Sequence, residues 1–151
     1  VFKCTNTDQT TNLNSGTPVP LPIVGTVEIN NTTGYFSPDI PGGTVTIQVA
    51  GLYRVTAGIA FAALNPAQNV QRTTLEFRVL QNGVAINPPY RNNYMRDQQQ
   101  HDQSSQPLAG EIFQFAAGDV ISMDVSMMSG NNGQIVMDGT NNFLQLEFLG
   151  N

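Results

Sequence analysis

Charged side chains are scarce in this sequence, which has six Lys and Arg and eleven Asp and Glu among 151 residues and a net charge of −5. A surface that binds nucleic acid normally carries a concentrated stripe of Lys and Arg, whereas the basic residues here are scattered along the chain. The same scatter argues against binding to a membrane surface. We therefore expect neither nucleic acid nor a membrane among the partners.

The sequence has one cysteine and one histidine, which excludes several kinds of site. Cys4 has no second cysteine in the chain to pair with; we interpret it as an unpaired thiol near a flexible end, with an interchain bond as the alternative. A serine–histidine–aspartate triad would need His101, which lies in the polar run QQQHDQSS and is better interpreted as an exposed loop residue. Cys4 and His101 are too far apart in the sequence to show the spacing of zinc ligands. We expect no catalytic residues, no cofactor and no enzymatic activity.

Three aspartates near one another in sequence, Asp119, Asp124 and Asp138, are the best candidates for a calcium site. Such a site needs several oxygen ligands that converge on one point, and no loop signature supports this, so we expect no bound metal. Asp119 has a simpler role available. In the turn Ala117-Gly118-Asp119 its short carboxylate can accept hydrogen bonds from the turn's own backbone.

Long hydrophobic runs are also missing, since no apolar stretch approaches the ~20 residues of a membrane-spanning helix. No secretory leader is recognisable, and the chain begins with Val1 rather than Met. This start fits a processed product and a piece of a longer chain equally well.

Alternation is the clearest positive signal. In AGLYRVTAGIAF, from Ala50 to Phe61, every second residue from Tyr53 onward is apolar, which predicts a strand with one buried face. Further strands are predicted at 23–29, 35–36, 44–49, 72–80, 84–86, 108–115, 120–128, 134–137 and 143–149. Gly, Pro and Asn separate these segments, and no helix is predicted. The fold class is therefore all-β, an antiparallel jelly-roll sandwich of about eight to ten strands.

The chain divides into two parts by composition. Residues 1–18 are polar and unpatterned, which predicts an N-terminal arm or linker. Residues 19–151 are expected to form a single domain, long enough to bury roughly two thirds of the surface that the unfolded chain exposes.

A long polar stretch at 87–107, NPPYRNNYMRDQQQHDQSSQP, interrupts the strand pattern. A loop of this length in a small domain tends to be functional, disordered or held by a neighbouring chain. It contains side chains that combine aromatic faces with hydrogen-bond donors, namely Tyr90, Arg91, Tyr94, Arg96 and His101. That composition is typical of sugar-binding and protein-binding surfaces, and packing between subunits is the open alternative.

Four short motifs occur in a characteristic order along the chain. They are Gly51-Leu52-Tyr53-Arg54-Val55, Leu75-Glu76-Phe77-Arg78-Val79 followed by Asn82-Gly83, Ala117-Gly118-Asp119-Val120-Ile121, and Asn142-Phe143-Leu144. Over about residues 36–150 this order resembles the complement globular-head and tumour-necrosis-factor superfamily. The resemblance implies a ten-stranded jelly roll that assembles as a homotrimer. No receptor-binding residue or calcium ligand is carried over to this sequence.

The back of the central strand supports such an assembly. Its small residues would let a second layer or subunit approach closely, and one sandwich core leaves this face uncovered. The predicted trimer-interface residues are Tyr53, Thr56, Gly58, Ala60 and Phe143.

Members of this superfamily include animal ligands, bacterial surface proteins and trimeric modules of phage and virus particles. A chain rich in amides and poor in cysteine and charge favours the last group. We therefore predict a non-enzymatic trimeric structural module on a particle exterior, such as a bacteriophage capsid decoration, cement or fibre-head protein. Its partners would be other virion proteins such as the capsid, and its location the virion surface. The alternative is a module of a phage fibre or bacterial surface that binds a cell-surface glycan or receptor.

Overall fold

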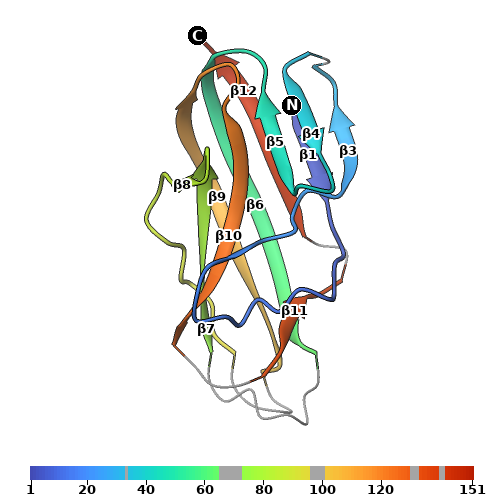
Figure 1. Ribbon diagram of the computed structural model, residues 1–151, viewed down its shortest axis with the longest axis vertical. Coiled ribbons are helices and arrows are strands. Elements are labelled where there is room, and N and C mark those ends of the chain that lie inside the picture. The colour runs from blue at the N-terminus through green and yellow to red at the C-terminus, as the bar shows by residue number, and fades with distance from the viewer. Residues whose placement is uncertain (33, 65–72, 96–100, 130–132, 140–141) are drawn as a thin grey trace.

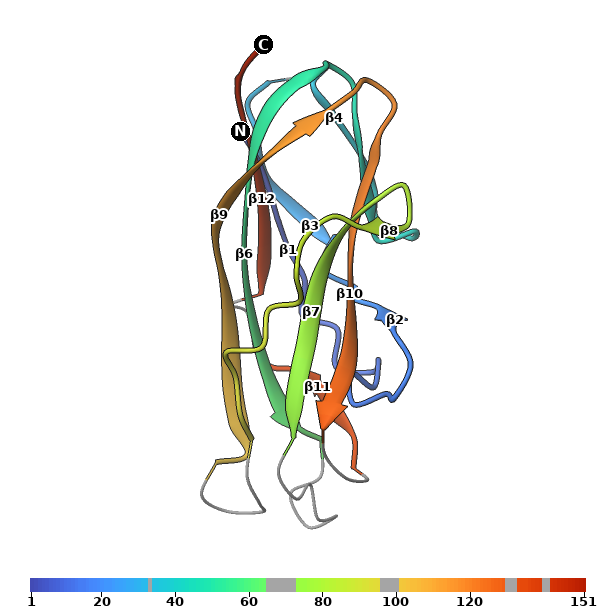
Figure 2. The same cartoon turned by 90° about the vertical axis from the view of Figure 1, so that its left-hand side faces the viewer.

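The computed structural model describes residues 1–32, 34–64, 73–95, 101–129, 133–139 and 142–151. In these ranges it contains twelve strands in two antiparallel six-stranded sheets, which face each other as a sandwich (Figures 1 and 2). Sheet A consists of β1 (Phe2–Thr5), β3 (Thr26–Asn30), β6 (Gly51–Ala63), β9 (Gln103–Phe115), β11 (Ile135–Met137) and β12 (Phe143–Gly150). Sheet B consists of β2 (Val19–Pro20), β4 (Phe36–Asp39), β5 (Thr44–Ile47), β7 (Thr74–Gln81), β8 (Val84–Ala85) and β10 (Val120–Ser129). The predicted all-β antiparallel sandwich is confirmed, although the strand count exceeds the expected eight to ten.

Strand β6 lies at the centre of sheet A, between β9 on one side and β12 and β11 on the other. Its alternation is the one predicted from the sequence. Tyr53, Val55, Ala57, Ile59 and Phe61 are all buried, and the residues between them are exposed or half-buried. Apolar burial on one side of the strand therefore sets which face of β6 meets sheet B.

Strands β11 and β12 pair with the same edge of β6, and the hydrogen-bond ladder along this edge is interrupted between them. One asparagine side chain bridges the gap. The buried Asn142 side chain accepts a hydrogen bond from Ala60 N at 2.7 Å and donates to Asp138 O at 3.0 Å. It thus takes the place of a backbone amide in the ladder, so the buried polar groups at the break stay paired.

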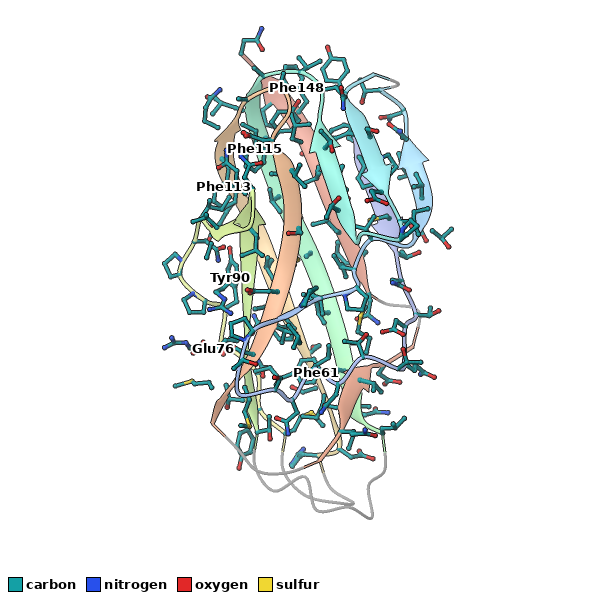
Figure 3. The ribbon with its side chains drawn as sticks, viewed as in Figure 1. Phe61, Glu76, Tyr90, Phe113, Phe115 and Phe148 are labelled. Atoms are coloured by element: carbon teal, nitrogen blue, oxygen red, sulfur yellow. The ribbon has the colours of Figure 1, made fainter. Side chains whose placement is uncertain are left out.

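Aromatic rings fill one end of the core. Tyr53 lies between Phe115 and Phe148, with ring centroids 5.6 and 5.3 Å away, and Phe36 contacts it edge-on at 5.8 Å. Phe115 and Phe148 are labelled near the upper end of the sandwich in Figure 3. The Tyr53 hydroxyl donates to Val49 O at 2.5 Å, so this buried polar group is satisfied.

The prediction of an N-terminal arm at 1–18 was wrong for much of that segment. Strand β1 is inserted between β12 and β3, with Phe2 and Cys4 fully buried. Further on, Leu13 is buried and its amide donates to Ile135 O at 2.7 Å. The segment then passes over the sandwich and pairs with β10 through β2, as the blue trace in Figure 1 shows. It closes one open side of the sandwich, which its polar composition did not reveal.

The position of Cys4 follows from this correction. It lies in β1 rather than near a flexible end, and burial raises the pKa of its thiol from 9.0 to about 11. A buried thiol of this kind is protonated at neutral pH and poorly reactive.

In the polar stretch at 87–107, the described residues on either side of 96–100 are more ordered than predicted. Strand β9 begins at Gln103, five residues before the expected start at Leu108. Residues 86–95, which we call the strap, run beside β7 with antiparallel bridges at Phe77–Tyr90 and Thr73–Met95. The strap covers the free edge of sheet B on the side opposite the N-terminal segment.

Candidate functional site

The candidate site is the outer face of sheet A, the side of β6, β9 and β12 that points away from sheet B (Figure 2). On β6 this face presents the small residues Thr56, Gly58 and Ala60, all half-buried. Exposed apolar side chains add to it, namely Leu52 of β6 itself at 39% exposure, Leu149 of β12 at 40% and Ile112 of β9 at 55%. This outer face therefore presents small and apolar side chains that are open to solvent.

Phe143 and Gly58 form the centre of the outer face. They are cross-strand partners, and a Cβ placed at Gly58 would lie 2.6 Å from Phe143 Cε1. The ring therefore lies flat on the strand, in space that any side chain at Gly58 would occupy. The Lys3 ammonium lies 5.5 Å from the centre of the same ring, in reach of a cation–π interaction.

The charges on the outer face are paired within the chain. Arg54 Nη1 lies 2.7 Å from Glu147 Oε2, and Lys3 Nζ lies 2.6 Å from Glu28 Oε2. Each pair joins one positive to one negative group, so these two pairs add no net charge, whereas the whole chain carries −5. Identical copies that approach through this face would meet little electrostatic repulsion.

The structure separates the five predicted interface residues into two groups. Thr56, Gly58, Ala60 and Phe143 share the outer face of sheet A, so a contact with a second subunit through them stays a prediction. Tyr53 points the other way and is fully buried among the aromatic rings of its own chain. Including Tyr53 was wrong, because successive side chains of a strand point to opposite faces.

Tyr90, labelled in Figure 3, and Arg91 were predicted as ligand contacts, and both make contacts that hold the strap. The Tyr90 hydroxyl interacts with the Glu111 carboxylate of β9, which links the strap to sheet A. Burial and then this carboxylate raise the pKa of Tyr90 well above its usual value. Arg91 Nε lies 2.7 Å from Glu76 Oε1, which links the strap to β7.

Two of the other residues of that predicted ligand site, Tyr94 and His101, are exposed side chains. Tyr94 is 49% exposed, and His101 is exposed at the start of the segment that leads into β9. Arg96 lies outside the described residues. Of the two alternatives left open for the long loop, packing describes Tyr90 and Arg91, although within one chain rather than between subunits.

Two of the three aspartates considered for calcium serve separate contacts. Asp124 forms a bidentate ion pair with Arg78, with N–O distances of 2.8 and 3.2 Å. The Asp119 carboxylate instead accepts hydrogen bonds from Gln81, Asn82 and Ala116. In the described ranges no three His, Cys, Asp or Glu side chains are grouped so that they could hold a metal ion. The same ranges contain no helix long and apolar enough to span a membrane.

Sequence reasoning missed Ile112 and Leu149 as parts of the outer face. Ile112 alternates with Phe113 in β9, so the pattern could have placed one of them outside. A register shift between Val55 and Ala57, opposite β9, obscures which one.

Two packed antiparallel sheets with this strand order define a jelly-roll sandwich. No family model matches the chain, and no curated protein matches it. Among solved structures it is similar to murine APRIL, with 13% sequence identity and a TM-score of 0.60, covering 98% of this chain and 97% of that chain. Rabbit GITRL is similar at 19% identity and a TM-score of 0.50, covering 98% of this chain and 92% of that chain. The chain therefore has the tumour-necrosis-factor-like jelly-roll fold, which confirms the predicted resemblance at the level of fold.

Proposed function

We propose that this protein is a non-enzymatic structural module that works as a homotrimer, with the outer face of sheet A as the contact between subunits. The main support is the composition of that face, which combines small residues, exposed apolar side chains and two ion pairs formed within the chain. Obligate interfaces commonly bury more than ~2,000 Å² and resemble domain cores, and a sheet face of this composition suits that requirement. Trimerisation is also typical of proteins with this fold.

Within that role we prefer the exterior of a particle, as a bacteriophage capsid decoration, cement or fibre-head protein on the virion surface. The support is compositional: amide side chains, little charge and one buried cysteine suit a rigid exposed module. Three copies held together would also multiply weak contacts with a capsid partner.

Light scattering at micromolar concentration tests the assembly. The wild-type protein should have the mass of a trimer, and Thr56→Arg should shift it to the monomer, because three buried guanidinium groups would meet without partners. Thr46→Arg is the matched control, since Thr46 occupies the outward face of β5 in sheet B and should leave the trimer intact.

A monomeric wild-type protein would contradict the trimer proposal. For the particle role, virions purified with and without the gene should be compared by immunogold labelling. Absence of label on wild-type particles combined with saturable binding on a glycan array would favour the alternative, a glycan-binding module.

A further inference from the structure

A pocket of about 310 Å³ opens on the side of the sandwich, between the segment 19–24 and the turn 40–43. Leu21 and Val24 are buried at its inner end, whereas Ile40 is 51% exposed at its margin. The volume lies at the lower end of the range for ligand-binding pockets in proteins. None of the side chains that line it belongs to a strand of sheet A.

One wall of the pocket is a capped turn. Asp39 Oδ1 accepts a hydrogen bond from Gly42 N at 3.1 Å, and Gly43 N donates to Ile40 O at 3.1 Å. Pro41 lies within the same turn and restricts its backbone further.

The opposite wall is held in a similar way. Asn6 Oδ1 accepts from Thr7 N at 2.7 Å and from Asp8 N at 3.1 Å, and its amide group donates to Pro22 O. Leu21 N donates to Met123 O at 2.9 Å, which fixes the inner end to β10. Because these walls are preformed, an occupant would lose little free energy to ordering them.

The chemistry of the lining selects the occupant. No lining residue is charged, and the Asn6 side chain already uses its oxygen and its amide nitrogen within the chain. Pro20, Pro22 and Pro41 supply three pyrrolidine rings. The C–H groups next to a proline nitrogen carry partial positive charge, which complements the negative face of an aromatic ring. Proline-rich peptides bind aromatic-lined grooves through the same complementarity. Here the prolines belong to the pocket, and the aromatic ring would belong to the ligand.

We propose that this pocket binds an aromatic side chain of a partner polypeptide, as an anchor residue. Aromatic anchors that fill preformed pockets commonly dominate the energetics of protein interfaces. Since its lining residues lie outside sheet A, the pocket stays open when the outer face is covered. The proposal therefore holds for a monomer as well as for a trimer and does not depend on the proposed function.

Titration of the ¹⁵N-labelled full chain with N-acetyl-tryptophanamide, followed by amide chemical shifts, tests the proposal. We expect saturable shifts at the amides of Val19, Leu21, Val24, Gly42 and Gly43, with a dissociation constant on the order of 1 mM. N-acetyl-leucinamide should bind about fivefold more weakly, because it lacks the aromatic face.

Ile40→Asp places a carboxylate at the margin of the pocket and should weaken binding of the tryptophan probe at least about fivefold. Val84→Asp is the matched control, since Val84 is 67% exposed in β8, is not among the lining residues and should leave binding unchanged. Absence of saturable shifts in the wild-type protein would overturn the proposal. Equal affinity for the leucine probe, or an unaffected Ile40→Asp variant, would overturn it as well.

Discussion

Asp119 connects two turns at one end of sheet B. Its carboxylate accepts hydrogen bonds from Ala116 N at 2.7 Å, Gln81 Nε2 at 2.6 Å and Asn82 Nδ2 at 2.8 Å. These donors favour the ionised form and lower the pKa of Asp119, with the Ala116 amide contributing most. The bond to its own turn was predicted, whereas the bonds to the β7–β8 turn depend on sheet pairing.

Replacing this carboxylate should have a pH-dependent cost. The pKa of Asp119 is lower in the folded state than the unfolded value near ~3.9. Its stabilisation is therefore fully present above about pH 4 and is lost as the pH falls through the folded-state value. We expect Asp119→Asn to reduce the free energy of unfolding by about 2 kcal/mol at neutral pH. Urea denaturation over a pH series should show this difference shrinking in acid, and a constant difference would contradict the argument.

At the scale of elements, the strap depends on one buried asparagine. Asn93 Oδ1 accepts from Leu75 N at 2.9 Å, and its Nδ2 donates to Leu75 O at 2.8 Å and to Gln106 Oε1 at 3.0 Å. It therefore satisfies the edge of β7 and also links sheet B to β9. A side chain here does what a neighbouring strand does elsewhere in the sheet.

We expect Asn93→Ala to destabilise the protein by about 2–4 kcal/mol, because it leaves buried backbone groups of Leu75 without partners. Hydrogen exchange should accelerate at the β7 amides before the rest of sheet B. Asn92→Ala, at an exposed neighbouring position, serves as the control. If both variants exchange alike, the strap is not held by Asn93.

Strand β1 allows a direct test of the correction made to the N-terminal segment. Phe2 is fully buried and contacts Phe36 with ring centroids 5.6 Å apart. We expect Phe2→Ala to cost about 3–5 kcal/mol in thermal or urea unfolding, as for other buried phenylalanines. Gln9→Ala, at an exposed position, should change stability by less than about 0.5 kcal/mol. Equal, negligible effects would restore the view of a detached arm.

At the scale of the whole molecule, the proposed trimer has a thermodynamic consequence. Subunits that bind each other when folded and separate on unfolding make the Tm rise with protein concentration. We expect this rise for the wild-type protein and for Thr46→Arg over about a hundredfold range of concentration, and its loss for Thr56→Arg. Scanning calorimetry measures it, and a Tm independent of concentration in all three would count against assembly through sheet A.

Long alternating strands could be predicted because the alternation of apolar and polar residues is visible within each segment alone. Strand β6 needs no other part of the chain to show which residues are buried. By contrast, β1 has four residues in a polar setting, so Phe2 and Cys4 show no period to read. The strap has no alternation because side chains such as Asn93 make part of its bonds to β7.

The candidate site was predictable to the same extent. Parity along β6 places Thr56, Gly58 and Ala60 on one face, and the same parity excludes Tyr53. The addition of Ile112 and Leu149 required the register of three strands, which a register shift alters.

The sequence by itself determined the class of fold and the two faces of β6, because hydrophobic alternation is a local property of the chain. Only the tertiary structure decided that residues 1–24 and the strap close the two sides of the sandwich. It also decided that Phe143 lies over Gly58 and that three prolines line one pocket. These features join residues distant in sequence, and their contacts exist only once the sheets have paired.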